Sequence, residues 1–351
     1  MLKSKLLPML LLICGLIVCG GFFQIANADE FSDWFQKGST FFSTGKYQDS
    51  LDAFNKAISL NPRSADAYTM RGKVYQWIKK RDQAISDFTK AIELNPNDFE
   101  AYYQRGTVYR ETGKETEAKR DWNKSIEIIG KNPKTAHEYD IRGNAHGKLG
   151  NLQEAIDDFT KAIELNPKFV EGYYNRGVAY RRMGNFKQAI VENTKAIEMS
   201  PRFTDAFFNR AVAYEREGKY PEALGDYTRV IEIDPNYSKA YGARGSLLFE
   251  TGNIKGSIAD LNKAIELDPK YSAAYFNRAV VHDSLGQYQQ AVEDFTKAMD
   301  LGVKTPQIYM MRGMSLVSMN RIEQGLEDFK SAARLGSQAA MDFLKGRGIN
   351  W

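Results

Sequence analysis

The chain contains 351 residues, of which 43% are hydrophobic and 26% charged, and it carries a formal net charge of +4. This composition is that of a folded protein and excludes a disordered or collagen-like chain. The near balance of charge gives no electrostatic footprint for nucleic acid, so we expect no nucleic-acid partner. Both cysteines, Cys14 and Cys19, lie near the amino terminus, which excludes a disulfide framework or a cysteine zinc site.

The amino terminus has the pattern of a secretory signal peptide. Two lysines precede an uncharged stretch at 6–28, which ends in Ala-Asn-Ala just before Asp29. This pattern predicts cleavage after residue 28 and export to the periplasm or out of the cell. A retained membrane anchor stays open, because 6–28 is long enough to cross a bilayer; only then would the chain contact a membrane. Lipid attachment at Cys19 is disfavoured by the bulky Val18 before it.

From residue 31 onward, a segment of constant length recurs along the chain. Prolines follow one another at intervals of 34 residues, with one interval of 37, at Pro62, Pro96, Pro133, Pro167, Pro201, Pro235 and Pro269. Two further segments close without proline, at 298–303 and 332–337. Such periodicity indicates a repeat architecture. It predicts nine repeats, numbered 1 to 9, at 31–62, 63–96, 97–133, 134–167, 168–201, 202–235, 236–269, 270–303 and 304–337.

Each repeat predicts two amphipathic helices. In repeat 2, an aromatic–glycine–aromatic stripe follows the i, i+4, i+7 spacing of one helix face, at Tyr68, Gly72 and Tyr75. A second stripe with the same spacing consists of Ala84, Phe88 and Ala91. A polar turn separates the two helices. One such pair cannot bury its apolar face alone, so neighbouring pairs must stack into an all-α fold.

This pattern resembles the tetratricopeptide repeat, and the resemblance covers nearly all of 31–337. The large–small–large set of the first helix recurs as Trp34, Gly38, Phe41; Tyr102, Gly106, Tyr109; Tyr173, Gly177, Tyr180; and Phe207, Ala211, Tyr214. The resemblance implies a right-handed α-solenoid of antiparallel helix pairs, whose first helices line a concave surface. It also implies a non-catalytic scaffold that binds protein or peptide partners. Residues 338–351 look like a capping helix and tail.

The expected concave surface carries aromatic and arginine side chains. The fifth position of the first helix is aromatic in five repeats, at Phe35, Tyr103, Tyr174, Phe208 and Phe276. Arginines stand near the end of the first helix, at Arg110, Arg181, Arg182 and Arg216. These residue types are frequent anchors of binding surfaces, so we predict a partner-binding groove there. The alternative is that the aromatics pack against the neighbouring repeat and the charges are solvated. The lysine–asparagine clamp of cytosolic chaperone adaptors does not appear; its nearest match is Asp140 with Asn144.

Arginine recurs at the seventh position of the first helix, and an acidic residue follows sixteen positions later. The pairs are Arg71 and Asp87, Arg105 and Asp121, Arg142 and Asp158, Arg176 and Glu192, Arg210 and Asp226, Arg244 and Asp260, Arg278 and Asp294, and Arg312 and Asp328. Repeat 1 lacks both partners, with Lys37 and Ala53 instead. The joint loss predicts a structural salt-bridge ladder, formed within a repeat or across a repeat boundary. A positive ladder for an acidic ligand is disfavoured, because the acids would neutralise it.

Two features interrupt the pattern. Repeat 3 has three extra residues at Gly130–Asn132, which predict an added turn or a bulged loop. Asn193 stands where the second helix otherwise places a large apolar residue, so it is either a satisfied buried amide or a weak point in the stack.

The sequence contains none of the motifs that would indicate catalysis. It has no phosphate-binding glycine loop, no nucleophile elbow and no HExxH pattern, so we expect no enzyme, no cofactor and no metal. The hypothesis from the sequence is a scaffold or assembly factor of a bacterial-type cell envelope. A membrane-anchored adaptor and a regulatory subunit of an envelope enzyme are the alternatives.

Overall fold

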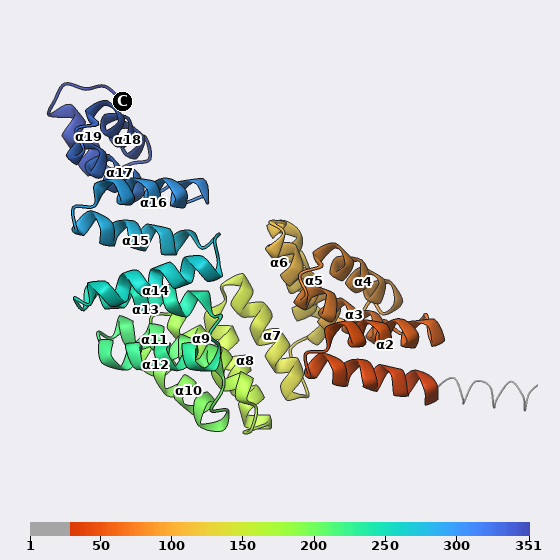
Figure 1. The fold of residues 1–351 in the computed structure, drawn as a ribbon. Coiled ribbons are helices and arrows are strands. Elements are labelled where there is room, and N and C mark those ends of the chain that lie inside the picture. Colours follow the sequence, from red (N-terminus) through yellow and green to blue (C-terminus); the bar gives the residue numbers. More distant parts are fainter. Residues whose placement is uncertain (1–28) are drawn as a thin grey trace, which may run out of the picture. The chain divides into compact units, whose positions relative to one another are not determined.

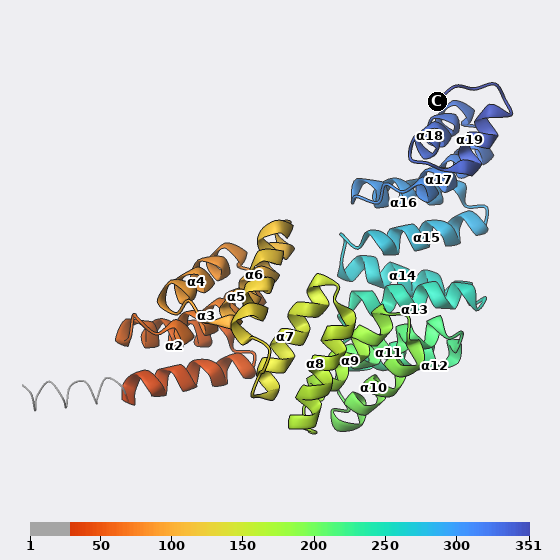
Figure 2. The same cartoon turned by 180° about the vertical axis from the view of Figure 1, so that it is seen from behind.

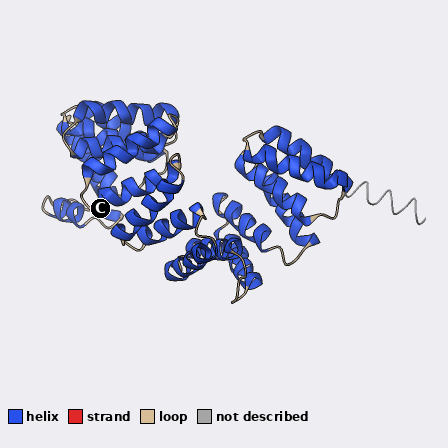
Figure 3. Ribbon diagram, turned by 90° about the horizontal axis from the view of Figure 1, so that it is seen from below, coloured by secondary structure: helices blue, strands red, loops and turns tan. Residues whose placement is uncertain are grey.

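The computed structural model describes residues 29–351, and every regular element in that range is an α-helix (Figures 1 and 3). The segment predicted as a signal peptide or anchor lies outside the described residues. Residues 29–43 are helical and are followed by α2 (Tyr47–Leu60), α3 (Ala65–Trp77), α4 (Arg81–Leu94), α5 (Phe99–Glu111), α6 (Glu115–Ile129), α7 (Ala136–Leu149), α8 (Leu152–Leu165), α9 (Val170–Arg182), α10 (Phe186–Met199), α11 (Thr204–Arg216), α12 (Tyr220–Ile233), α13 (Ser238–Glu250), α14 (Ile254–Leu267), α15 (Ser272–Ser284), α16 (Tyr288–Asp300), α17 (Pro306–Ser318), α18 (Ile322–Arg334) and α19 (Gln338–Lys345).

The chain divides within α9 into two compact parts, which we call the amino-terminal half, up to Gly172, and the carboxy-terminal half, from Tyr173. Within each half, a second helix packs on the first helix of its own repeat and on the first helix of the next repeat (Figures 1 and 2). First helices of adjacent repeats also touch, as α3 and α5 or α13 and α15 do. The predicted all-α helical repeat solenoid is therefore confirmed.

The two helices of a repeat approach closely because small and large residues face each other. In repeat 2, Phe88 is fully buried against Gly72, where an added Cβ would lie only 2.7 Å from the Phe88 ring. Ala84 and Ala91 are buried on the same face of α4. Small residues thus let the backbones approach, and one large ring fills the space between them.

The last helix covers the end of the carboxy-terminal half. Helix α19 buries Ala340 and Leu344 against α18, and the ring of Phe343 lies 4.8 Å from that of Phe329. Every helix among the described residues is too short or too polar to traverse a lipid bilayer.

The three extra residues of repeat 3 mainly lengthen a loop. Helix α6 has 15 residues, one more than α4 or α8, and residues 130–135 form the connection to α7. Gly130 adopts a φ of 72° where α6 ends. Helix α7 then begins with a capping box, in which the Thr135 hydroxyl and the Glu138 carboxylate each accept a backbone N–H. The lengthened loop, rather than an added helical turn, absorbs the insertion.

Asn193 is a buried amide that is only partly satisfied. Its Nδ2 donates to the Ala189 carbonyl at 2.7 Å, whereas its Oδ1 is buried with no hydrogen-bond partner among the described residues. The side chain faces Gly177, as the large apolar residues of other repeats face their small partners. Both expectations hold in part, because one end of the amide is bonded and the other is not.

Replacing Asn193 by leucine, the type found at the equivalent Leu261, is expected to raise the free energy of unfolding by about 1–2 kcal/mol, since it removes a buried unpartnered oxygen and adds apolar contact. Urea unfolding of the variant measures the change. The exposed Asn123, replaced in the same way, is the control and should change stability by less than about 0.5 kcal/mol. A less stable Asn193→Leu variant would show that the packing around Gly177 requires the amide.

Candidate partner-binding face

The eight predicted arginine–acid pairs are all in contact, each between the first and second helix of one repeat. The ion-pair distances lie between 2.6 and 2.8 Å. In repeat 3, Arg105 donates from Nε to Asp121 Oδ2 at 2.7 Å and from Nη2 to Oδ1 at 3.0 Å. The two side chains are 11% and 2% exposed. The planar guanidinium therefore holds a buried carboxylate at two points.

The same arginines also reach the preceding repeat. The Nη1 of Arg105 donates to Thr89 Oγ1 at 3.1 Å, and five further arginines bond the equivalent threonine or asparagine: Arg71 to Asn55, Arg210 to Thr194, Arg244 to Thr228, Arg278 to Asn262 and Arg312 to Thr296. Arg142 instead donates to the carbonyl of Gly130, which follows the last residue of α6, and Asn123 donates to the Lys119 carbonyl of its own helix. The ladder thus joins helices both within a repeat and across repeat boundaries.

The threonine and asparagine partners of the ladder were not predicted from the sequence. The available signal was the Thr or Asn that begins the TKAIEL-like segment of the second helix in repeats 1 to 8. In the described structure, the eight ladder arginines contact carboxylates of the second helices and are at most 22% exposed. They are structural residues.

The predicted groove aromatics pack within and between repeats. Tyr174 lies with its ring 4.9 Å from that of Phe203, which precedes the first helix of the next repeat. Phe208 contacts Tyr227 of its own repeat and Tyr237 of the next, at 5.6 and 5.5 Å. The same fifth position in two other repeats pairs with the second-helix aromatic, Phe35 with Phe54 and Phe276 with Phe295. Only part of each ring remains accessible.

Tyr103 follows the same pattern. It packs against the cluster of Ala118, Trp122 and Ala145, and burial raises the pKa of its hydroxyl well above the usual range. At the equivalent place in repeat 7, Gly242 leaves room for Tyr271, whose ring would lie 2.6 Å from an added Cβ. These contacts agree with the alternative in which the fifth-position aromatics join neighbouring repeats.

The four predicted groove arginines differ in their surroundings. Arg110 is exposed, with its guanidinium 5.1 Å from the centre of the Trp122 ring. Arg182 and Arg216 are also exposed, at the ends of α9 and α11. Arg181 is half-buried and donates from Nε to Asn209 Oδ1, which ties α9 to α11. The structure thereby brings Arg181 and Arg216 to one end of the first helices in the carboxy-terminal half.

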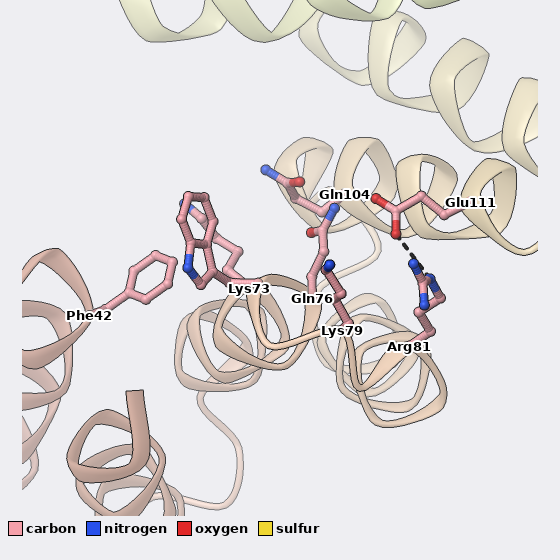
Figure 4. A pocket seen from close by; sticks show the side chains of 8 residues that line it. Phe42, Lys73, Gln76, Lys79, Arg81, Gln104 and Glu111 are labelled. Carbon is pink, nitrogen blue, oxygen red and sulfur yellow. Dashed lines mark hydrogen bonds and ion pairs between the residues drawn. The ribbon is translucent and has the colours of Figure 1, made fainter. Parts of the chain in front are cut away.

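A pocket that was not predicted from the sequence lies on the first-helix face of the amino-terminal half (Figure 4). Its volume is about 590 Å³, and its walls are Phe42, Lys73, Gln76, Trp77, Lys79, Arg81, Gln104 and Glu111. Trp77 is 63% exposed and lies with its ring 6.4 Å from that of Phe42. The side chains of Gln76 and Gln104 extend into the space between Phe42 and Glu111 (Figure 4). The pocket therefore combines an aromatic wall with amide and charged groups.

A chain of charges borders this pocket and links three first helices. Lys73 Nζ of α3 lies 2.8 Å from Glu100 Oε1 of α5, and Glu100 Oε2 lies 3.4 Å from His137 Nε2 of α7. Burial alone would raise the pKa of Glu100, but the hydrogen bond from His137 and the charge of Lys73 outweigh it and bring that pKa to about 2. The hydrogen bond to Glu100 correspondingly raises the pKa of His137.

We expect His137 to make stability depend on pH. Because its folded-state pKa lies above the unfolded value of 6.5, its stabilising contribution is fully present below that value and disappears as the pH rises through the folded pKa. The melting temperature of His137→Gln should therefore fall below that of the unaltered chain near pH 5.5 and equal it above about pH 8. Glu100 loses its own contribution only as the pH falls towards about 2, outside this window.

His146 offers the matched control for that measurement. Burial lowers the pKa of His146, so its contribution has the opposite sign and is lost as the pH falls through the folded pKa. His146→Gln should not lower stability preferentially at pH 5.5. Parallel pH profiles for the two variants would contradict the assignment of the effect to the contact between His137 and Glu100.

Comparison with protein-family models assigns the repeat. A model described as a TPR repeat matches 38–76, 143–184 and 245–283. Three models described as tetratricopeptide repeat match 65–98, 170–203 and 204–237; 88–120; and 272–301. Together these matches cover more than half of the chain. Among curated proteins, no sequence matches this chain.

Solved structures include several with a similar fold. The APC/C hetero-tetramer Cut9-Hcn1 aligns with a TM-score of 0.59 and 13% identity over 90% of this chain and 75% of that one. Human IFIT1, solved as a dimer with PPP-AAAA, aligns with a TM-score of 0.56 and 15% identity over 83% of this chain and 69% of that one. YrrB, a TPR protein with an unusual peptide-binding site, is 26% identical over 55% of this chain and 98% of its own, with a TM-score of 0.37. With its matching models and its stacked helix pairs, the chain belongs to the tetratricopeptide repeat family.

Proposed function

We propose that this protein is a non-catalytic scaffold or assembly factor of the cell envelope, which binds partner segments on its first-helix face. Proteins of this repeat family generally serve as protein-interaction scaffolds. The observation that carries the proposal is the pocket at Trp77. An indole that is 63% exposed beside two glutamine amides offers a partner both apolar area and hydrogen bonds.

Trp77 differs from the other aromatics of the first helices. The fifth-position rings contact neighbouring side chains, whereas most of the Trp77 side chain lies open to solvent. Tryptophan is enriched among the residues that dominate binding energy at interfaces. The amides of Gln76 and Gln104 can each donate and accept a hydrogen bond, which suits the backbone of an extended or helical segment.

The predicted contacts in the carboxy-terminal half are a second part of this proposal. Tyr174 and Phe208 are partly covered by Phe203 and Tyr237, so the arginine head groups offer the more accessible contacts there. Substituting these aromatics would disturb the junctions between repeats. The pocket at Trp77 is consequently the better place for a test.

The test is site-specific photocrosslinking in the native cell with a benzoylphenylalanine at position 104. We expect covalent adducts with a partner protein at Gln104, and their loss when Trp77→Ala is introduced as well. The matched control position is Lys90 on α4, which is exposed on a second helix and should give none of these adducts. Equal adducts at Lys90, or adducts at 104 that persist in Trp77→Ala, would contradict binding at this pocket.

The envelope location is tested separately, by mass spectrometry of the amino terminus in fractionated cells. A chain that begins at Asp29 in the exported fraction supports cleavage and export. An intact amino terminus in the membrane fraction supports the anchored adaptor, and lipid on Cys19 supports attachment by a lipid. An intact chain in the cytosol contradicts the envelope role.

A further inference from the structure

Arg181 lies half-buried on the first-helix face and has no acidic partner among the residues that the structure describes. Each of the eight ladder arginines contacts a carboxylate of its own repeat at 2.8 Å or less. The described part of the chain places no carboxylate within ion-pair distance of Arg181, whose hydrogen bond goes to the neutral Asn209. Burial lowers the pKa of its guanidinium, and the charges of Arg182 and Arg216 lower it further. A partly buried cation without a counter-charge is unfavourable, and an anionic ligand would relieve that cost.

Asn209 fixes the direction of this cation. It is 5% exposed, and its Oδ1 accepts the hydrogen bond from Arg181 Nε. Its Nδ2 is buried with no hydrogen-bond partner among residues 29–351. The Asn209 amide and the Arg181 guanidinium thus supply several donors at one place, and within 29–351 the acceptor that Arg181 contacts is the amide oxygen of Asn209.

We propose that Arg181, Asn209 and Arg216 form an anion site that binds a carboxylate side chain of an acidic partner segment. We call these three residues the arginine site. The inference rests on the proposed function, which it deepens by naming the chemistry of the partner. Arg181 would hold the carboxylate through the guanidinium nitrogens that Asn209 does not engage, and Arg216, exposed at the end of α11, would add charge at the rim.

The surrounding charges favour a carboxylate over a nucleic-acid backbone. Glu215 follows Phe208 by two helical turns, and its carboxylate accepts a hydrogen bond from the Tyr227 hydroxyl at 2.9 Å. Burial raises the pKa of Glu215, and the charge of Glu250 raises it further. A nucleic-acid backbone has a charge fixed at every nucleotide and would place phosphates against these acids, whereas a flexible acidic peptide can turn one carboxylate toward the arginines and its other carboxylates toward solvent.

The first experiment measures binding by fluorescence anisotropy. The probe is a fluorescein-labelled hexaglutamate peptide, and a labelled hexaglutamine peptide is the reference. We expect hexaglutamate to bind more tightly, with an affinity that falls as salt is raised. Arg181→Gln should weaken the binding about tenfold, and Arg181→Lys, which keeps the charge but loses the fork, should weaken it less. Arg229→Gln is the control, because Arg229 is exposed on α12 and already paired with Glu232.

The second experiment separates a binding role from a structural one by thermal unfolding. Arg181→Gln should leave the melting temperature unchanged or raise it, since it removes an uncompensated cation. Arg210→Gln, on the neighbouring first helix, should lower the melting temperature, because it leaves Asp226 without its partner. An equal decrease in both variants would show that Arg181 is structural and would overturn the proposal.

Two other results would also overturn it. One is equal affinity for the two peptides, or hexaglutamate binding that Arg181→Gln leaves unchanged. The other is tighter binding of a single-stranded oligoadenylate, lost in Arg181→Gln, which would identify a nucleic-acid site. The crosslinking test at Gln104 uses the other half of the chain, so the two proposals can fail separately. Adducts at Gln104 together with no binding of hexaglutamate would contradict the proposed carboxylate ligand and would still support the scaffold function.

Discussion

Replacing Arg105 by alanine is expected to lower the free energy of unfolding by about 3–5 kcal/mol, because it leaves a buried carboxylate without a partner. Asp121 is 2% exposed and receives both of its ion-pair contacts from Arg105. The substitution also removes the hydrogen bond to Thr89, which joins repeats 2 and 3. Urea unfolding measures the loss, and hydrogen exchange of α5 and α6 shows where the chain opens.

Two comparisons make this prediction specific. Lys124→Ala removes an ion pair with Glu127 in which the two side chains are 40% and 68% exposed, and it should leave the free energy of unfolding nearly unchanged, because solvent screens an exposed pair. The double variant Arg105→Met, Asp121→Leu should recover much of the stability lost in Arg105→Ala, since an apolar pair avoids an unpaired buried charge. A loss for Arg105→Ala no larger than that for Lys124→Ala would show that the pair is solvated in solution.

Truncation of Phe295 to alanine is expected to cost a similar amount, about 3–5 kcal/mol, through lost burial and the cavity it leaves. The ring is fully buried among Ala279, Ala291 and Ile308, which belong to α15, α16 and α17. In a stack of repeats each repeat contacts its neighbours alone, so amide exchange should accelerate in α15–α17.

Amide exchange also measures how far the destabilisation by Phe295→Ala spreads along the chain. Exchange in α3–α5 should stay unchanged in Phe295→Ala. Tyr220, which is 37% exposed, provides a control whose truncation should cost less than about 1 kcal/mol. Acceleration of exchange throughout the chain to the same extent would mean that the repeats unfold as one cooperative unit.

The sequence allowed the fold and the arginine ladder to be predicted because both rest on recurrence. A period of 34 residues with alternating helix stripes leaves few other folds, and the joint absence of both ladder partners in repeat 1 indicated their contact. The second contact, to Thr89 and its equivalents, could not be derived in the same way. It depends on the direction of a single guanidinium nitrogen, which helix spacing does not determine.

The candidate site was harder to predict because binding residues depart from the repeat. The fifth-position aromatics drew attention since they recur, yet recurring residues in a solenoid tend to serve the packing that every repeat shares. Trp77 occurs at a position where other repeats carry different side chains, so a search for recurring residues does not select it. Arg181 could be named from the sequence, but the absence of an acid beside it appears only when α9 and α11 are placed together.

The ladder also makes whole repeats interchangeable. Repeats 2 to 8 each carry an acidic residue for their own arginine and a threonine or asparagine at the place that precedes the next arginine by one helix pair, so their two ends match in sequence. Excision of 236–269 would bring Arg278 to the place of Arg244, with Thr228 as its acceptor in place of Asn262. Shortening or lengthening the protein in steps of one full period thus preserves each hydrogen bond at the seam. A cut of any other length would leave the arginine facing the wrong residue, and at the one such irregularity, ahead of Arg142, the carbonyl of Gly130 serves as acceptor.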